Sequence, residues 1–476
     1  MRSYPLYLNG RFVPGNEMVA VRNPATGEIF AKMTICSRDQ VRTAIENAHA
    51  AFAGWRRLPG KARGEFLSRI ADETERRKDE IARAITLENG KPLAQSHGET
   101  AMTVDHLRWF AEEARRGYGR IIPNQAEGKR HLVIKSPIGV VGTIGPWNFP
   151  LVLGIRKVAP ALAAGCTVIH KPASATPVST ALFAECVQSA GLPTGVFQFV
   201  VGTASEIGAE FLENPLCRKI SFTGSTEVGR RLIAAAAATV KPLSLELGGC
   251  SPLLVFEDGD IEQAVEGTIL AKFRNSGQSC IAANRIYVHR LIYPRFLDLL
   301  AVRVRALNVG NGLEPGMDIG PLISEQAVDV AEHHVRDAVA QGARLVCGGT
   351  RVGGLPGSFF SPTVLADVPD SAICFREETF APIAPVSPFD TEDEAIRRAN
   401  STSYGLSAYA FTRDLDRAFR LMESLEAGMI SINDGLPTTT CCPFGGVKQS
   451  GWGRELGVEG MDAFLETKHI SFGVHA

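Results

Sequence analysis

One cysteine and one glutamate, each in a glycine-containing segment, are the residues best suited to covalent chemistry. Cys280 ends the segment NSGQSC (residues 275–280), and Glu246 begins the segment ELGG (residues 246–249), 34 residues earlier. A thiol is the strongest side-chain nucleophile, and a carboxylate can act as a base. If both share a pocket, the chain can form and hydrolyse a thioester. Most cysteines are buried and inert, so a catalytic Cys280 needs partners elsewhere in the chain.

Two further segments offer such partners. Asn148 lies in PWNFP (residues 146–150), and its amide could donate a hydrogen bond to a developing oxyanion. The alternative is a proline-rich turn before a helix. Lys171 follows the next expected strand, where a lysine suits ribose hydroxyls or phosphate, and the alternative is a solvated lysine.

The segment FTGS (residues 222–225) leads into an expected helix whose free amides could hold a phosphate. GSTEVG (residues 224–229) has the glycine spacing of a P-loop, but Arg230 and Arg231 replace the lysine and the hydroxyl residue, which argues against a Walker loop. No GxGxxG pattern follows the first strand. Any dinucleotide is therefore expected to bind in a non-standard way.

Composition favours a globular protein with a small-molecule pocket. The 476 residues predict two or three structural units, and a net charge of -1 gives no footprint for nucleic acid or an anionic membrane. Residues 136–155 carry no charge but contain three prolines, which argues against a lipid-exposed helix. The N-terminus lacks the apolar run of a signal peptide. Ten scattered cysteines without ligand spacing predict reduced thiols, a cytoplasmic location and no metal site.

The order of apolar segments predicts an α/β fold. Residues 4–14 suggest a hairpin turning at Asn9-Gly10, and residues 39–118 are helical in pattern. Strands alternating with helices then predict a doubly wound parallel sheet, which binds ligands at the carboxyl ends of its strands. The expected strands are 138–144, 166–170, 197–201, 219–222 and 242–246, and the expected helices are 151–164, 177–190, 204–213 and 225–238.

The alternation restarts after a hinge expected near Gly248-Gly249. Strands at 252–256 and 284–288, with helices at 260–273 and 293–306, predict a second doubly wound domain. The final stretch, 458–476, alternates weakly and could be an edge strand available for subunit pairing.

Taken together and in this order, the four segments resemble the NAD(P)-dependent aldehyde dehydrogenase superfamily over nearly the whole chain. The resemblance extends to EETFAP (residues 377–382), where Ala381 replaces the family's glycine, and to PFGGVKQSG (residues 443–451). It implies that Cys280 attacks the aldehyde, Asn148 stabilises the oxyanion, and hydride passes to the nicotinamide. Glu246 would then activate the water that hydrolyses the thioester, with Glu455 as a secondary acid or base.

The resemblance also implies a cofactor site. Its contacts would be Trp147, Lys171, Ser174, Gly202, Ser225, Glu378 and Phe380. Members strict for NAD often carry glutamate at the position of Ser174, where its charge would repel a 2′-phosphate. A serine beside Lys171 therefore predicts that NADP is accepted as well as NAD.

Within the superfamily the chain is most similar to succinate-semialdehyde dehydrogenases. That likeness implies that Arg156 and Arg274 clamp the distal carboxylate, assisted by a hydroxyl near Thr439; the alternative for each arginine is surface ion pairing. Bidentate guanidinium groups suit a carboxylate and position the carbonyl. Ala282 replaces the second cysteine of the subfamily's redox switch, so no such switch is expected. Departures at TTT (residues 438–440) and GRELG (residues 453–457) leave glutarate semialdehyde, sulfolactaldehyde or a neutral aldehyde as alternative substrates.

Two other functional classes fit the sequence less well. A thiol esterase or hydrolase would need a histidine base, and the nearest, His289, has no evident orienting partner. A non-catalytic scaffold would not need the nucleophile, base and amide together. The resemblance implies a homodimer or homotetramer acting on a small aldehyde. We expect an NAD(P)-binding domain at 1–120 and 140–249, a catalytic domain at 250–440, and oligomerisation strands at 121–139 and 458–476.

Overall fold

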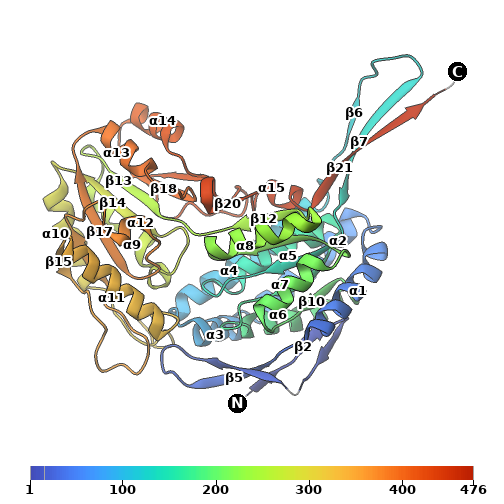
Figure 1. The fold of residues 1–476 in the computed structure, drawn as a ribbon, viewed down its shortest axis with the longest axis horizontal. Coiled ribbons are helices and arrows are strands. Elements are labelled where there is room, and N and C mark those ends of the chain that lie inside the picture. Colours follow the sequence, from blue (N-terminus) through green and yellow to red (C-terminus); the bar gives the residue numbers. More distant parts are fainter. Residues whose placement is uncertain (1, 16, 475–476) are drawn as a thin grey trace.

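The computed structural model describes residues 2–15 and 17–474, which form two α/β lobes and a projecting β arm (Figure 1). Each lobe is built on one large sheet, of eight strands in the first lobe and seven in the second. This arrangement confirms the predicted α/β class with two largely parallel sheets. Among the described residues, no helix is long and apolar enough to cross a membrane.

The first sheet has five parallel central strands in the order β12-β11-β8-β9-β10. Their bounds lie close to those predicted: β8 (Val140–Ile144), β9 (Thr167–Lys171), β10 (Phe197–Phe199), β11 (Cys217–Thr223) and β12 (Leu243–Glu246). The order reverses at β8, which has β9 on one side and β11 on the other. Loops after β8 and β11 therefore border a topological switch point, where such sheets bind ligands.

The connecting helices also lie close to the predicted ranges: α5 (Val152–Ala164), α6 (Val178–Ser189), α7 (Ala204–Glu213) and α8 (Thr226–Ala236). The predicted hairpin is confirmed as β2 (Leu6–Leu8) and β3 (Arg11–Val13), and β2 pairs antiparallel with β10. Asn9 and Gly10 have φ values of 46° and 77°, the left-handed pair that a tight hairpin turn requires.

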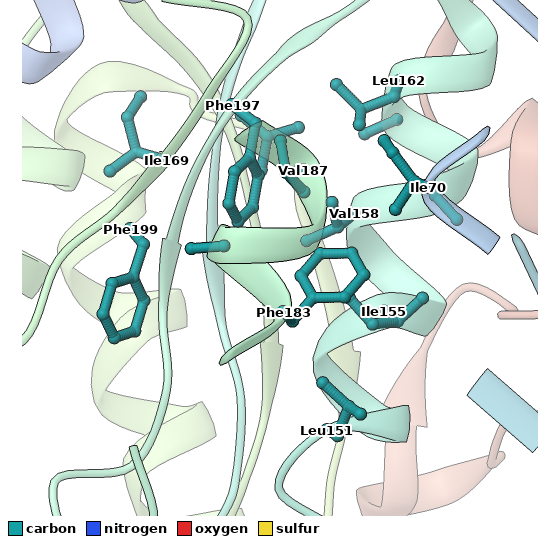
Figure 2. Close-up of a cluster of buried hydrophobic side chains, with 14 of the residues drawn as sticks. Ile70, Leu151, Ile155, Val158, Leu162, Ile169, Phe183, Val187, Phe197 and Phe199 are labelled. Atoms are coloured by element: carbon teal, nitrogen blue, oxygen red, sulfur yellow. The ribbon is translucent and has the colours of Figure 1, made fainter. Parts of the chain in front are cut away.

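The helical segment before this sheet forms four helices: α1 (Arg38–Trp55), α2 (Gly60–Arg76), α3 (Lys78–Asn89) and α4 (Leu93–Glu113). Helices α2 and α4 pack against α5, so α5 is buried along its whole length. Figure 2 shows part of this core, where Phe183 and Phe197 pack edge to face with ring centroids 5.9 Å apart. Residues 136–155 carry no charge because they comprise the buried strand β8, the turn after it and the buried start of α5. Strands β1 (Arg2–Tyr4), β5 (Ile29–Thr34) and β4 (Met18–Arg22) form a separate small sheet.

The second sheet is parallel except at one edge, where β15 pairs antiparallel with β16. Its strands in spatial order are β15 (Arg344–Cys347), β16 (Thr363–Ala366), β17 (Ile383–Phe389), β14 (Ala283–His289), β13 (Ser251–Val255), β18 (Ser407–Phe411) and β19 (Met429–Ile432). Its helices are α9 (Ile261–Phe273), α10 (Tyr293–Arg305), α11 (Glu325–Ala340), α12 (Ile373–Arg376), α13 (Glu392–Asn400) and α14 (Leu415–Ser424). The strands and helices predicted between 252 and 306 are confirmed to within a residue or so at each end.

Two segments link the lobes. Gly248 and Gly249 join β12 to β13, and the short strand β20 (Gly451–Trp452) returns from the second lobe to pair antiparallel with β12. In this register Gly451 lies opposite Glu246. The candidate base is therefore flanked by the chain's C-terminal part.

The arm consists of β6 (Arg120–Ile122), β7 (Lys129–Pro137) and β21 (Leu465–Gly473), in the order β21-β7-β6 (Figure 1). The strand expected over 458–476 is shorter than predicted, because a short helix, α15 (Glu459–Asp462), packs against α5 before β21 begins. Ala476, at the end of that predicted range, lies outside the described residues.

Candidate active site

Cys280 lies on a loop between α9 and β14 whose backbone is held in an unusual conformation. Asn275, Ser276 and Gly277 have φ values of 51°, 56° and 75°, so three consecutive residues are left-handed. Non-glycine residues pay for this conformation and keep it only where surrounding contacts impose it. A Cβ on Gly277 would lie 2.1 Å from the carbonyl oxygen of Ala381, so only glycine fits there. Such constrained loops are typical of functional sites.

The contacts that impose this conformation are buried hydrogen bonds. The Asn275 amide nitrogen Nδ2 donates to the Asn148 carbonyl oxygen at 2.8 Å, and Ser276 Oγ donates to the Gly320 carbonyl oxygen at 2.9 Å. The linker between the lobes adds a close approach, since a Cβ on Gly249 would lie 2.4 Å from the Cys280 carbonyl oxygen. The nucleophile loop is thus fastened to both lobes.

Asn148 lies beside this loop at the switch point of the first sheet. Its Nδ2 donates to the Gln278 carbonyl oxygen at 3.1 Å, two residues before Cys280. An amide nitrogen carries two N–H groups, so the second can serve a substrate oxygen at the thiol. The structure therefore brings the predicted oxyanion donor and nucleophile together.

A buried ion pair supports Asn148 from behind. Lys91 Nζ lies 2.6 Å from Glu99 Oε2 and donates to the Asn148 carbonyl oxygen at 2.8 Å. The other Glu99 oxygen accepts from the backbone N–H groups of Leu151 and Val152 at the start of α5. Burial lowers the pKa of Lys91 to about 8, although Glu99 opposes that shift. This pair fixes the turn that carries Asn148.

Glu246, at the end of β12, is buried at the junction of the two lobes. A Cβ on Gly445 would lie 2.8 Å from Glu246 Oε1, and Glu246 Oε2 has no hydrogen-bond partner among the described residues. Burial raises the pKa of Glu246 well above its usual value, and the charge of Glu455 raises it further. A buried carboxylate oxygen without a partner is rare and suits a group that must exchange a proton.

Glu455 belongs to a second buried network beside Glu246. Lys157 Nζ, fully buried on α5, contacts Glu455 Oε1 and donates to Thr223 Oγ1 at 2.5 Å. The second oxygen, Oε2, has no partner in the described structure. The structure thus places Glu455 close enough to act on the protonation of Glu246.

The Cys280 side chain keeps part of its surface accessible. Most of its surroundings are nevertheless protein, and burial raises the pKa of the Cys280 thiol to about 12. The charges of Glu378 and Glu246 raise this pKa further, whereas the charge of Arg156 lowers it. Forming the thiolate therefore depends on a nearby base or cation.

A small pocket opens beside Cys280, and both predicted arginines line it. Arg156 lies over the ring of Phe444, and Arg274 lies over the ring of Phe149, with Cζ-to-centroid distances of 4.6 Å and 4.9 Å. Within residues 2–15 and 17–474, neither guanidinium pairs with a carboxylate. Burial lowers the pKa of both groups, but a guanidinium stays charged in proteins. Two partly dehydrated cations without counter-charge favour an anionic ligand.

Two hydroxyl residues line this pocket, Ser279 next to Cys280 and Thr438 in the segment 438–440. Thr439, predicted to assist the arginines, is exposed, and its Oγ1 lies 3.7 Å from Cys441 Sγ. Thr440 instead donates to Asp105 on α4. The structure therefore does not bring Thr439 together with Arg156 and Arg274.

The predicted cofactor residues lie around the switch point. Lys171 ends β9, where its buried Nζ donates only to the Pro172 carbonyl oxygen, at 3.1 Å, among the contacts of the described chain. Ser174 follows in the next turn and is half-buried. Ser225 caps α8 by accepting from the Val228 N–H at 3.3 Å, and the first amides of α8 remain unused by the helix. These donors fit a phosphate-containing ligand.

The remaining cofactor residues border the same region. A Cβ on Gly202 would lie 3.0 Å from the Cys36 carbonyl oxygen, so this turn tolerates little beyond glycine. Trp147 and Phe380 pack edge to face with centroids 5.6 Å apart, and Phe380 has a φ of 44°. Glu378 Oε1 accepts from the Gly249 N–H at 3.2 Å, and burial raises the pKa of Glu378 to about 8. These side chains connect the first sheet to the nucleophile loop.

Sequence patterns did not single out the buried supports of the site. Lys157 next to Arg156 in an apolar helix was a usable signal, since a lysine in a buried helix needs a partner. Lys91 and Glu99 gave no such signal, because besides pairing with each other they hydrogen-bond to backbone groups of residues 148–152, far along the chain. His289 contacts the carbonyl oxygen of Asp390 at 3.1 Å and no group of the Cys280 pocket. No group of three or more potential metal ligands occurs in the part of the chain described.

Comparisons with known proteins agree with this geometry. Residues 12–470 match the Aldehyde dehydrogenase family. A glutarate-semialdehyde dehydrogenase of Pseudomonas aeruginosa is 48% identical over 469 residues, covering 98% of this chain and 97% of the relative. An NADP-linked succinate-semialdehyde dehydrogenase of Escherichia coli is 46% identical over 469 residues, with 98% and 97% covered.

A solved structure described as an E. coli NADP-dependent enzyme superposes with a TM-score of 0.98 at 46% identity, covering 99% of this chain and 98% of that one. Fold, site and sequence thus agree over nearly the full length, and the chain belongs to the aldehyde dehydrogenase family.

Proposed function

We propose that this enzyme oxidises a short anionic aldehyde, most specifically succinic semialdehyde to succinate, with NAD(P) as the oxidant. The observation that supports this proposal is the pair Arg156 and Arg274 in one pocket with Cys280 and without a carboxylate partner in the described chain. A pair of guanidinium groups suits the distal carboxylate of such a substrate. Holding that end positions the carbonyl carbon at the thiol.

The first step is attack of Cys280 on the aldehyde carbon. The thiol must lose its proton, and the charge of Arg156 favours the thiolate. The attack turns the carbonyl oxygen into an oxyanion. The free N–H of Asn148 then donates to that oxygen, an interaction that strengthens as negative charge develops.

The cofactor site comprises Lys171, Ser174, Ser225 and Glu378 on the first lobe and the adjoining loop. When bound, the nicotinamide accepts the hydride that leaves the substrate carbon. Lys171 and Ser174 together give a 2′-phosphate charge and space, so we propose that NADP is accepted alongside NAD. The E. coli relative's name, which specifies NADP, supports this assignment.

Glu246 activates the water that hydrolyses the resulting thioester. A carboxylate with a raised pKa is a stronger base than an ordinary glutamate, so ionised Glu246 can take a proton from water, and the water oxygen then attacks the acyl carbon. The carboxylic acid leaves and the Cys280 sulfur regains a proton. Glu455, held by Lys157, sets the charge beside Glu246 and is the secondary acid or base.

The chain length of the aldehyde is the least constrained part of the proposal. The P. aeruginosa and E. coli relatives carry names for glutarate and succinate semialdehyde, which share a distal carboxylate and differ by one methylene. A methylene changes binding by only about 1–3 kcal/mol. Glutarate semialdehyde and sulfolactaldehyde therefore remain the alternative substrates.

An aldehyde panel tests the proposal. Succinic, glutaric and sulfonated aldehydes would be compared with propanal, each with NAD and NADP, by absorbance of the reduced cofactor. The expected result is a higher kcat/KM for an anionic aldehyde than for propanal, with succinic semialdehyde foremost. A higher kcat/KM for propanal would contradict it. Ester hydrolysis without cofactor at a comparable rate would favour the hydrolase alternative.

The assembly is a second part of the proposal. We propose that residues 1–120 and 140–249 bind the cofactor and that residues 250–440 carry catalysis. Residues 121–139 and 458–476, which include the arm strands β7 and β21, would make the contacts in a homodimer or homotetramer. The arm projects from the first lobe (Figure 1). Ile121 on β6 and Phe472 on β21 are exposed on this arm. Light scattering of the full chain tests this assignment, and a monomer at micromolar concentration would contradict it.

A further inference from the structure

Two adjacent cysteines lie on a loop at the mouth of the Cys280 pocket. All ten cysteines are free thiols, and Cys441 and Cys442 are the exposed pair, whereas Cys280 and Cys347 are half-buried and the other six are buried. The mouth loop, residues 436–444, carries Thr438 and Phe444, which both line the pocket. Phe444 is also the ring over which Arg156 lies. The exposed thiols are thus covalently linked to residues that shape substrate binding.

The loop is fastened on either side of the thiols. The Gly457 N–H donates to the Thr440 carbonyl oxygen at 3.0 Å. Phe444 and Glu455 exchange two backbone hydrogen bonds, each of 2.7 Å. Gly457 also lies against the thiol segment, since a Cβ there would be 3.2 Å from the Cys442 carbonyl carbon. Residues 441–443, between these two sets of hydrogen bonds, therefore have little freedom to change conformation without moving the anchored residues.

We propose that Cys441 and Cys442 form a reversible oxidation site that controls access to the pocket. The oxidant is a low-molecular-weight disulfide, RSSR. The Cys441 thiolate attacks one sulfur of RSSR, forming a mixed disulfide and releasing one RS⁻. Cys442 then loses its proton and attacks the Cys441 sulfur, expelling the second RS⁻. The two cysteine thiols are oxidised to one disulfide, and RSSR is reduced to two RSH.

Geometry assigns Cys441 the first step. Its sulfur is exposed and lies 3.7 Å from Thr439 Oγ1, a hydroxyl that can donate to a thiolate. Burial, the neighbouring Cys441 thiol and the charge of Glu459 raise the pKa of Cys442, so Cys442 keeps its proton longer and suits the second step.

Ring closure couples this chemistry to substrate binding. A disulfide between neighbouring residues closes a small ring that the present backbone at 441–442 must bend to accommodate. Because Thr440 and Phe444 are anchored on either side, the short segment between them cannot absorb the bend. The strain therefore reaches these anchors and shifts Phe444, whose ring lies under Arg156. A displaced clamp raises KM for an anionic aldehyde. Strained, exposed disulfides are readily reduced. Excess low-molecular-weight thiol therefore converts the disulfide back to the two cysteine thiols.

The test compares reduced enzyme with enzyme treated with glutathione disulfide. Peptide mass spectrometry locates the oxidation by the loss of two hydrogens from the peptide containing residues 441 and 442. Kinetics use whichever anionic aldehyde the panel shows to be best, so failure of the succinic semialdehyde assignment does not affect this test. KM is expected to rise about tenfold on oxidation and to return with dithiothreitol.

Cys441→Ser and Cys442→Ser should abolish the KM response, whereas the half-buried Cys347→Ser, on β15 of the second sheet, should retain it. Oxidation of Cys280 itself would lower kcat in every variant alike, which separates it from a change in KM. The proposal is overturned if KM responds equally in Cys441→Ser, or if the mapped disulfide forms without changing KM. It is also overturned if residues 441 and 442 stay reduced.

Discussion

Arg156 and Arg274 line the same pocket, each guanidinium over a different phenylalanine ring. Burial lowers the pKa of the Arg274 guanidinium, and the charge of Arg156 lowers it further. The two positions are 118 residues apart in the chain (274 − 156) and lie on different lobes. Cation–π contacts hold the arginines in place without consuming their N–H donors. The pair is therefore free to bind a substrate anion.

Replacing Arg274 with alanine should weaken binding of the anionic substrate selectively. Loss of charge-assisted hydrogen bonds of about 1.5–3 kcal/mol predicts a rise in KM for succinic semialdehyde of roughly tenfold to a hundredfold. Propanal has no distal carboxylate, so its KM should change little. Steady-state kinetics with both aldehydes measure the difference, and the exposed Arg231→Ala serves as a control. Equal losses on both aldehydes would refute the carboxylate clamp.

Glu246→Gln should stop turnover after the first half-reaction. Glutamine preserves the shape of the side chain but cannot take a proton from water. Hydrolysis should slow by about 10²–10⁴-fold while one equivalent of reduced cofactor per active site still forms in a burst. Rapid mixing measures the burst, and intact-mass analysis should detect the acyl-enzyme. Loss of the burst together with turnover would place Glu246 in the first half-reaction instead.

The pH dependence of deacylation follows from the environment of Glu246. Burial and the charge of Glu455 raise its pKa, and only the ionised carboxylate can act as a base. Deacylation should therefore slow as pH falls through this raised pKa and accelerate as pH rises through it. Glu455→Gln removes one cause of the shift, so the profile should move to lower pH. Single-turnover hydrolysis across pH tests this, and an unmoved profile would show that Glu455 has no electrostatic effect on Glu246.

Cofactor choice should depend on Lys171. Its Nζ lies at the end of β9 and can contact a bound cofactor. Removing it should weaken binding of NADP more than binding of NAD, because only NADP carries the 2′-phosphate. Lys171→Ala is thus expected to lower kcat/KM for NADP by about tenfold relative to NAD. A preference of the unmodified enzyme for NAD of about a hundredfold or more would contradict NADP use.

Local patterns in the sequence were sufficient for the fold. The alternation between 138 and 306 predicted strands and helices because apolar runs separated by turns encode βαβ units directly. Cys280, Asn148 and Glu246 were identified by resemblance. The buried ion pair behind Asn148 was not predicted. Lys91 and Glu99 contact backbone groups of residues 148–152, and only tertiary packing brings these groups near the pair. The resemblance indicated a hydroxyl near Thr439, whereas the structure has Thr438 at the pocket. Neighbouring loop residues point in different directions, and a loop has no periodicity that would show which residue faces the pocket.

The final prediction concerns the buried pair that supports Asn148. Glu99→Gln leaves Lys91 as an uncompensated buried charge and should destabilise the first lobe by about 3–5 kcal/mol. Burial already lowers the pKa of Lys91 to about 8, from 10.5 for an exposed lysine. Between these two pKa values, Lys91 is protonated in the unfolded chain and neutral in the folded chain. The contribution of Lys91 to the free energy of unfolding therefore increases as the pH rises from the lower value to the higher one. Without Glu99 the pKa of Lys91 should fall further, so the pH range over which stability rises should extend toward neutral pH.

Urea unfolding followed by fluorescence at several pH values measures the effect. Glu65→Gln, which removes only the exposed contact with Lys61, is the control and should change stability by less than about 1 kcal/mol. A Glu99→Gln enzyme as stable as the control would show that Lys91 finds another partner and that the pair does not fix the turn bearing Asn148.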